Sequence, residues 1–252
     1  MKLILSYLLS PIFFALLGLW MLFMHLFQLV ALLFGYKSHK FSVKILNLGI
    51  VGLTKILGTK YRYNGFEKLD KNKRYLFICN HQSSWETPPL MIKLAPFHMK
   101  FIAKKELSKF IPSVSINLKK GGSLLIDRSK GTESRVQIEE YAKTLKAKGF
   151  SVLIFPEGTR GKKGELGKFR SGGIKSILNG YPDINVVPIA IKGSWKFTKY
   201  GVFPKSFGET IEYNVLNEQT LNIENLEMQL NDIKIQINEK LSLSEGGEVV
   251  LL

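Results

Sequence analysis

Short apolar runs alternate with stretches of helical spacing through the middle of the chain. Five runs of five to eight residues, rich in Ile, Leu, Val and Phe, predict buried strands. Between the third and the fourth run, residues 135–149 have the apolar spacing of a helix that ends at Gly149. This alternation predicts an α/β fold, with a largely parallel sheet covered by helices. The predicted strands are 74–79, 99–103, 123–127, 151–155 and 184–191.

The amino-terminal part of the chain is apolar without interruption. Residues 3–35 contain no Asp, Glu, Lys or Arg. A helix of this length would extend about 50 Å, whereas the hydrocarbon core of a bilayer is about 30 Å thick. The stretch is too long for a cleaved signal peptide, and no small-x-small cleavage site follows it. We therefore expect a helical membrane anchor, either one tilted span or a hairpin in one leaflet, with Pro11 and Gly18 as possible bends.

Basic residues follow the apolar stretch and predict its orientation. Residues 41–58 keep helical apolar spacing and include lysines, which is typical of an interfacial helix. Lysines from Lys37 onward place the body of the protein at the cytoplasmic side of the inner membrane. We predict membrane-anchoring helices over 1–58, an α/β domain over 59–243 and a loose tail over 244–252. Residues 222–243 are expected to form a closing amphipathic helix.

The charge of the chain is strongly positive and unevenly distributed. The net charge is +16; residues 207–252 carry nine acids and two lysines, a net of −7, so residues 1–206 carry +23. Such a surface suits nucleic acid, anionic lipid or an acidic protein. No helix-turn-helix, zinc-finger or RNP signature is visible. The apolar amino-terminal stretch favours an anionic lipid bilayer over nucleic acid as the partner.

The single cysteine excludes an internal disulfide framework, and the scattered histidines give no metal-binding pattern. Cys79 ends the first predicted strand, where a packed core residue is the simplest interpretation. A thiol nucleophile remains an alternative, because His81 is two residues away.

A histidine and a carboxylate follow the first predicted strand, in "NHQSSWE". His81 can take up a proton near neutral pH, and Glu86 on its second ring nitrogen would orient the ring. Taken alone, the pair fits a polar loop equally well.

Glu86 has a second possible role, since Ser83 and Glu86 have the spacing of a capping box. In that case Pro88 and Pro89 would fall at the fifth and sixth helical positions, where they remove hydrogen bonds. We expect Thr87 to be the cap instead, with Pro88 at the first helical position and Glu86 free for another role.

Three further polar clusters follow predicted strands, where ligands collect in parallel sheets. Lys104 lies in the first, where a solvated surface lysine is the alternative to a binding role. Asp127 and Arg128 end the second, where a salt bridge within the loop is the alternative to a binding role. The third cluster, residues 155–173, places Arg160 among lysines and glycines, and an arginine fork matches phosphate oxygens. A disordered basic loop is the alternative there.

Four blocks of sequence resemble the glycerolipid acyltransferase family. They are "NHQSSWE", "GSLLIDR", "FPEGTR" and "VVPIAI", in this order between residues 80 and 191. The apolar amino terminus is also similar to the membrane anchor of that family. One departure is Glu86, where the family more commonly has an aspartate.

The resemblance implies a function and a set of site residues. It implies acyl transfer from an acyl thioester, acyl-ACP or acyl-CoA, to the free sn-2 hydroxyl of lysophosphatidic acid, giving phosphatidic acid. The implied catalytic residues are His81 and Glu86, without a metal or another cofactor. The residues implied for the acceptor phosphate and its pocket are Arg160, Arg128, Lys104, Glu157, Gly158 and Thr159.

The implied partners are a membrane lipid substrate, the anionic bilayer and an acidic acyl carrier protein, but no nucleic acid. Two alternatives stay open. The same chemistry could act on another lysophospholipid, or the chain could be an inactive lipid-binding membrane protein.

Overall fold

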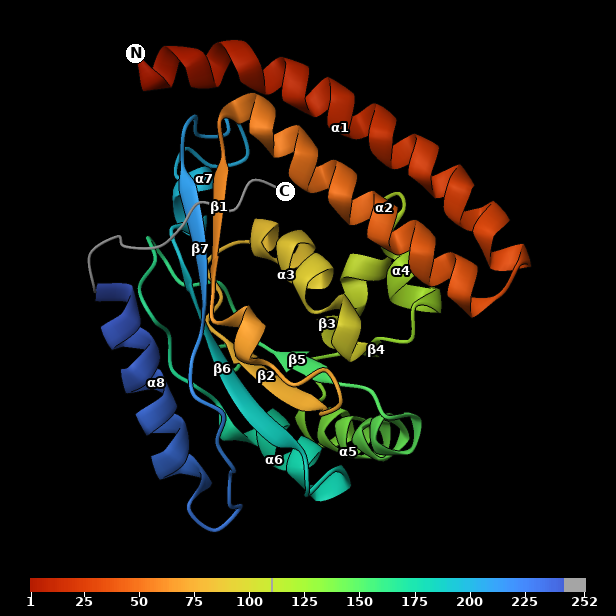
Figure 1. Cartoon of the computed structure of the whole chain (residues 1–252), viewed down its shortest axis with the longest axis vertical. Helices are drawn as coiled ribbons and strands as arrows, with labels where there is room; N and C mark the ends of the chain where they lie inside the picture. The colour runs from red at the N-terminus through yellow and green to blue at the C-terminus, as the bar shows by residue number, and fades with distance from the viewer. Residues whose placement is uncertain (110, 243–252) are drawn as a thin grey trace.

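One sheet of seven strands forms the centre of the molecule, in the order β1-β7-β6-β2-β5-β3-β4. The computed structural model describes residues 1–109 and 111–242, so the predicted tail over 244–252 lies outside the described residues (Figure 1). The strands are β1 Lys60–Asn64, β2 Tyr75–Cys79, β3 Lys100–Lys104, β4 Leu124–Ile126, β5 Val152–Ile154, β6 Asn185–Lys192 and β7 Thr210–Val215.

The five predicted strands are β2 to β6, and they run parallel to one another. The predicted α/β fold with a largely parallel, helix-covered sheet is therefore confirmed. β7 pairs antiparallel with β6, and β1 pairs parallel with β7, so two strands run against the other five. All five residues of β2 are buried, because helices cover both faces of the sheet at its centre.

The helices form layers on the two faces of the sheet (Figure 1). Side chains alternate along β2, so Phe77 packs in the core beneath α2 and α3, whereas Ile78 packs in the core beneath α5, α6 and α8. The predicted helices over 135–149 and 222–243 correspond to α5 and α8. The α-helices are α1 Lys2–Leu33, α2 Tyr36–Thr54, α3 Thr87–Lys93, α4 Val114–Lys120, α5 Gly131–Lys148, α6 Ser171–Gly180, α7 Ser194–Phe197 and α8 Leu226–Ser242. Five short 3₁₀ helices are η1 Lys55–Leu57, η2 Phe66–Lys68, η3 Ser84–Glu86, η4 Ala95–Phe97 and η5 Lys105–Ser108.

The two amino-terminal helices form an antiparallel hairpin along one end of the sheet (Figure 1). α1 continues without a break through Pro11 and Gly18. The chain then reverses at Gly35, whose φ of 87° lies in the region that glycine adopts without strain. β1 begins at Lys60, three residues after η1 ends at Leu57.

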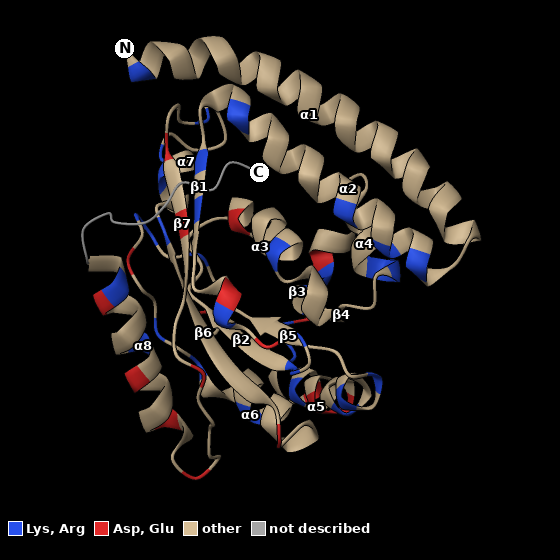
Figure 2. Cartoon of the chain, in the orientation of Figure 1, with Lys and Arg blue, Asp and Glu red and all other residues tan. Residues whose placement is uncertain are grey.

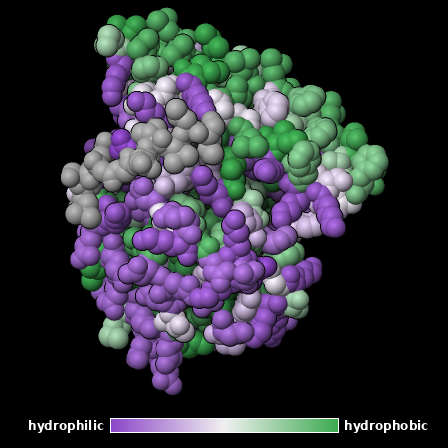
Figure 3. Space-filling view, viewed as in Figure 1, coloured by the Kyte–Doolittle hydropathy of each residue, from purple (hydrophilic) through white to green (hydrophobic). Residues whose placement is uncertain are grey.

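The outer face of α1 is apolar and its inner face carries polar side chains. Leu8, Leu19 and Leu26 are 63–65% exposed, whereas Ser10 and Gln28 are fully buried against the rest of the protein. Figure 3 shows hydrophobic surface along α1. Figure 2 shows α1 free of charge after its first residue, with lysines along α2. Of the helices described, α1 is the one long and apolar enough to cross a membrane. This pattern indicates association with a membrane.

Candidate active site

His81 and Glu86 lie beyond the carboxyl end of β2 and contact each other. Nδ1 of His81 is hydrogen-bonded to Oε1 of Glu86. The Glu86 side chain is fully buried, whereas the His81 side chain is 20% exposed. Within the described residues, Nε2 of His81 has no hydrogen-bond partner. The arrangement fixes one ring nitrogen in the protein and leaves the other available to a ligand.

Glu86 is held in place by the start of its own helix. Its carboxylate accepts hydrogen bonds from the backbone N–H groups of Gln82 and Ser83, at 3.2 and 3.1 Å. The Ser83 hydroxyl accepts in turn from the N–H of Trp85 at 3.2 Å. These contacts form a capping box at η3.

The expectation that Thr87 caps the helix and leaves Glu86 free was wrong. The capping box belongs to η3, a single turn, and α3 begins afterwards at Thr87. Pro88 and Pro89 therefore occupy the second and third positions of α3, in the first turn, where an N–H has no partner within the helix. Because a carboxylate accepts several hydrogen bonds, Glu86 serves the cap and His81 together.

Residues of the neighbouring strands brace the ends of this turn. The Asn80 side chain donates to the carbonyl oxygen of Ile191 at 2.9 Å and accepts from its N–H at 2.7 Å, which ties the end of β2 to β6. The hydroxyl of Tyr213, on β7, donates to the backbone carbonyl of Glu86 at 3.2 Å. The position of Asn80 beside His81 was visible in the sequence, but the part of Tyr213 was not.

The loop after β5 packs against His81. The ring of Phe155 stacks on the imidazole, with 4.2 Å between ring centres. The Glu157 carboxylate accepts from the N–H groups of His81 and Gly167, both at 2.7 Å. The N–H of Gly161 donates to the carbonyl oxygen of His81 at 2.8 Å. Burial raises the pKa of Glu157, although both N–H groups favour its ionised form.

Arg128 connects the end of β4 to the same loop. Its Nη1 donates to the carbonyl oxygen of Gly158, a residue whose φ of 70° suits glycine in a tight turn. The alternative of a salt bridge with Asp127 is not formed, since Asp127 instead accepts from the N–H and hydroxyl of Ser129, at 3.0 and 2.6 Å. Burial, followed by repulsion from Arg170, lowers the pKa of Arg128.

The remaining predicted residues lie on the surface around this loop. Thr159 and Arg160 are exposed and follow Gly158 directly. Lys104 ends β3, is half exposed, and lies 3.7 Å from a carboxylate oxygen of Glu106. The structure thus brings Arg128 and the loop after β5 together, and leaves Lys104 near the same edge with no hydrogen bond or ion pair to them among the described residues.

Neither a thiol nor a metal cluster adds to the site in the described part of the chain. Cys79 is buried, and burial followed by the negative charge of Glu86 raises the pKa of its thiol well above the ordinary value, which disfavours a nucleophilic thiolate. Among residues 1–109 and 111–242, no group of three or more His, Cys, Asp and Glu side chains is arranged to hold a metal ion.

The chain is similar in sequence to acyltransferases of Pseudomonas aeruginosa and Ovis aries. The chain is 33% identical over 153 residues to 1-acyl-sn-glycerol-3-phosphate acyltransferase of Pseudomonas aeruginosa, which covers 60% of this chain and 57% of that protein. It is 28% identical over 156 residues to 1-acyl-sn-glycerol-3-phosphate acyltransferase alpha of Ovis aries, covering 62% of this chain and 53% of that one. The chain thus spans somewhat more than half the length of these curated relatives.

A solved structure extends the similarity beyond the segments matched in sequence. The crystal structure of the 1-acyl-sn-glycerophosphate (LPA) acyltransferase PlsC from Thermotoga maritima superposes with a TM-score of 0.76 at 20% identity, covering 98% of this chain and all of that one. The sequence profile of the Acyltransferase family matches residues 60–192, which include His81, Glu86 and the loop after β5. The chain belongs to the Acyltransferase family.

Proposed function

We propose that this protein transfers a fatty acyl group from an acyl thioester, acyl-ACP or acyl-CoA, to the sn-2 hydroxyl of lysophosphatidic acid. The product would be phosphatidic acid. The observation that carries the proposal is the contact between Nδ1 of His81 and the fully buried carboxylate of Glu86, beside a partly exposed imidazole. The names of the relatives support the choice of acceptor.

The proposed reaction uses His81 as a base and then as an acid. Nε2 of His81 accepts the proton of the acceptor hydroxyl while the oxygen attacks the thioester carbonyl. The tetrahedral intermediate collapses as the carbon–sulfur bond breaks, and the thiolate takes the proton back from Nε2. Glu86 stabilises the imidazolium that forms between these steps and keeps Nε2 directed outward. The ring of Phe155 restricts rotation of the imidazole.

Cations around the loop after β5 are proposed to bind the acceptor phosphate. Arg160 is exposed on the loop, and Arg128 reaches the loop from β4. Lys104 ends the strand next to β4 and adds positive charge at the same edge of the sheet. Glu157, Gly158 and Thr159 shape the loop, with Glu157 fixing it to His81. An arginine and a phosphate make paired, charge-assisted hydrogen bonds.

Replacing Arg160 with alanine tests phosphate recognition. We expect kcat/KM for lysophosphatidic acid to fall roughly 10–150-fold, since a hydrogen bond to a charged group contributes about 1.5–3 kcal/mol. The measurement compares this acceptor with monoacylglycerol. Because monoacylglycerol lacks the phosphate, the wild type and the Arg160→Ala variant should use it equally well. Lys162→Ala, which removes a charge from the same loop, is the control. Equal losses with both acceptors, or with both variants, would contradict phosphate recognition by Arg160.

We further propose that residues 1–58 form the anchoring unit, with α1 and α2 as a hairpin in one leaflet and the α/β domain, from residue 59, at the cytoplasmic face of the inner membrane. α1 lies along the domain, because the N–H groups of Lys205 and Phe207 donate to the hydroxyls of Ser10 and Ser6, at 2.8 and 3.0 Å. Phe13 packs 5.5 Å from the ring of Trp85, one residue before Glu86. A lipid acceptor would therefore reach the site without leaving the bilayer.

The hairpin predicts that both ends of α1 face the cytoplasm. Single Lys2→Cys and Lys37→Cys variants should react with an impermeant maleimide in inside-out membrane vesicles and stay unlabelled in right-side-out vesicles. The native Cys79 is buried, so the wild-type protein gives the background. A transmembrane α1 would instead expose the two positions on opposite sides, and labelling of Lys2→Cys in right-side-out vesicles would rule out the hairpin.

A further inference from the structure

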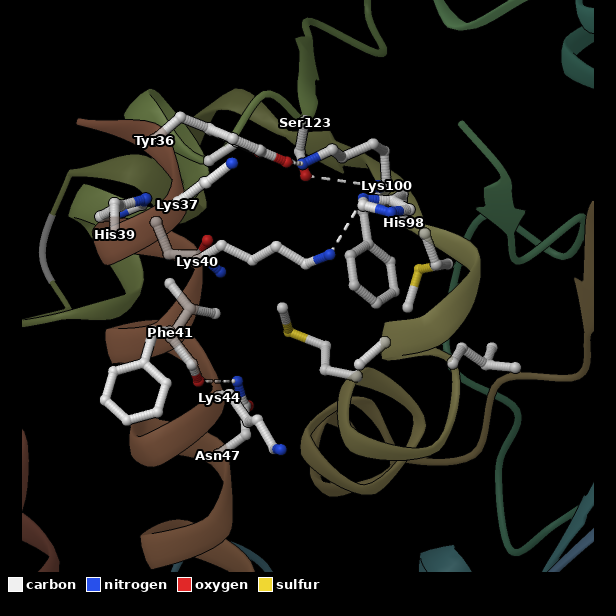
Figure 4. Close-up of a pocket in the computed structure, with 18 residues that line it drawn as sticks. Tyr36, Lys37, His39, Lys40, Phe41, Lys44, Asn47, His98, Lys100 and Ser123 are labelled. Atoms are coloured by element: carbon white, nitrogen blue, oxygen red, sulfur yellow. Dashed lines mark hydrogen bonds between the residues drawn. The ribbon is translucent and has the colours of Figure 1, made fainter. Parts of the chain in front are cut away.

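A cavity of about 280 Å³ lies between α2, α3 and the start of β3 (Figure 4). Lys100 lines the cavity and is the first residue of β3, which runs parallel to β5 and hence to β2. The cavity is therefore at the amino edge of the parallel strands, whereas His81 follows their carboxyl edge. A strand of five residues spans roughly 17 Å, so the cavity is separate from the candidate active site.

The lining of this cavity is basic. It includes four lysines and two histidines, and none of the described residues that line it is Asp or Glu. Figure 4 shows the side chain of Lys40 pointing to His98 and that of Lys100 pointing to Tyr36. The ammonium of Lys40 is 2.9 Å from Nδ1 of His98, so this nitrogen accepts and the imidazole is neutral. Lys100 donates to the hydroxyl of Tyr36 at 2.6 Å and to the carbonyl oxygen of Gly121 at 2.5 Å.

Two lysines of the cavity have no carboxylate partner among the described residues. In the described part of the chain, neither Lys40 nor Lys100 forms an ion pair with a carboxylate. Lys100 is only 8% exposed, and burial together with Lys148 lowers its pKa to about 8. Burial and neighbouring cations also lower the pKa values of Lys40 and His98. A bound anion would reduce the repulsion among these cations and offset the cost of burying them.

We propose that this cavity binds a phosphate group, held by Lys40, Lys100 and the Nε2–H of His98. Part of the wall is apolar, formed by Phe41, Val43, Met91 and Leu94, and can accept hydrocarbon next to the phosphate. α2 packs against α1, the helix with the apolar outer face, so the cavity lies close to the anchoring surface. The phosphate can belong to a lipid head group or to a free phosphate in solution, and the experiment separates these sources.

The imidazole of His98 reports on the cavity directly. Full-length protein with ¹⁵N-labelled histidine, in detergent, is titrated with inorganic phosphate, and the His98 signal is assigned with a His98→Asn variant. Binding should shift this signal in a saturable manner, because the phosphate would accept from Nε2–H of His98 and place a negative charge beside the ring. Lys40→Gln should weaken binding at least ~10-fold, the lower end for loss of a charged hydrogen bond. Lys119→Gln, which removes an exposed charge from the neighbouring α4, is the matched control.

A second arm uses nanodiscs of phosphatidylcholine with and without phosphatidylglycerol. A shift of His98 in the phosphatidylglycerol discs without added phosphate identifies a lipid head group; a shift only on addition of inorganic phosphate identifies a free phosphate. Arg160→Ala should leave the titration unchanged, because Arg160 belongs to the proposed acceptor site and not to this cavity. The result of the titration therefore does not depend on whether the proposed activity is correct. The proposal is overturned if His98 does not respond in either arm, or if Lys40→Gln and Lys119→Gln behave alike.

Discussion

Replacement of His81 by alanine is expected to lower kcat by about 10²–10⁴-fold, the usual contribution of a general base. The reason is the geometry of the ring, whose Nδ1 is engaged by Glu86 and whose Nε2 has no partner in the described structure. The rate is measured as release of thiol from an acyl thioester in the presence of lysophosphatidic acid.

The His81→Ala protein should remain folded. The backbone bonds of residue 81 to Glu157 and Gly161 do not need the imidazole, and its side chain is already partly exposed. Thermal unfolding and binding to lipid vesicles provide the controls. Turnover within a few-fold of wild type in a folded protein would exclude His81 as the base.

Replacement of Glu86 by glutamine is expected to lower kcat by roughly 10²-fold or more, by analogy with the loss of a preorganised electrostatic contact. A neutral amide cannot stabilise the imidazolium, and its NH₂ group would meet the N–H donors of Gln82 and Ser83. Glu86→Asp should retain far more activity, because it keeps the charge although it shortens the side chain.

Folding must be separated from catalysis in these Glu86 variants. An unsatisfied buried donor costs about 1–3 kcal/mol, so kcat is measured at a temperature where the variants and wild type are folded. Glu140→Gln removes an exposed carboxylate on α5, outside the site, and should leave kcat unchanged. If Glu86→Gln turned over like wild type, Glu86 would serve only the capping box.

The parallel centre of the sheet could be predicted because β2, β5 and the middle of β6 are largely buried on both faces and therefore apolar. The edge formed by β1 and β7 was not predicted, because the prediction relied on continuous apolar runs, whereas KYRYN and TIEYNV alternate apolar with polar residues. These polar residues bind one another across the two strands. Arg62 pairs with Glu212 at 2.8 Å, and Asn64 donates to Asn214 at 2.7 Å. Such pairing is a tertiary contact between two distant segments, which neither segment shows on its own.

Spacing and residue types left the pairing of His81 with Glu86 and a polar loop equally open, and the family resemblance favoured the pairing. The support around the two residues was not predicted. From the sequence spacing, the capping box and the contact with His81 were alternative roles for Glu86. In the structure the Glu86 carboxylate has both roles. In the same way, Asp127 and Arg128 are adjacent in sequence yet bind different partners, and Arg128 instead reaches Gly158 on the loop after β5. Contacts across 30 residues require the folded sheet to bring the loops together.

The identity of the acceptor is the central claim, and a competition among acceptors tests it most directly. Purified full-length protein is supplied with a long-chain acyl thioester and, in parallel, with lysophosphatidic acid, glycerol 3-phosphate or lysophosphatidylcholine. We expect kcat/KM to favour lysophosphatidic acid by at least ~10-fold, which corresponds to about 1.4 kcal/mol of transition-state binding. A preference for glycerol 3-phosphate or lysophosphatidylcholine would contradict the proposed acceptor.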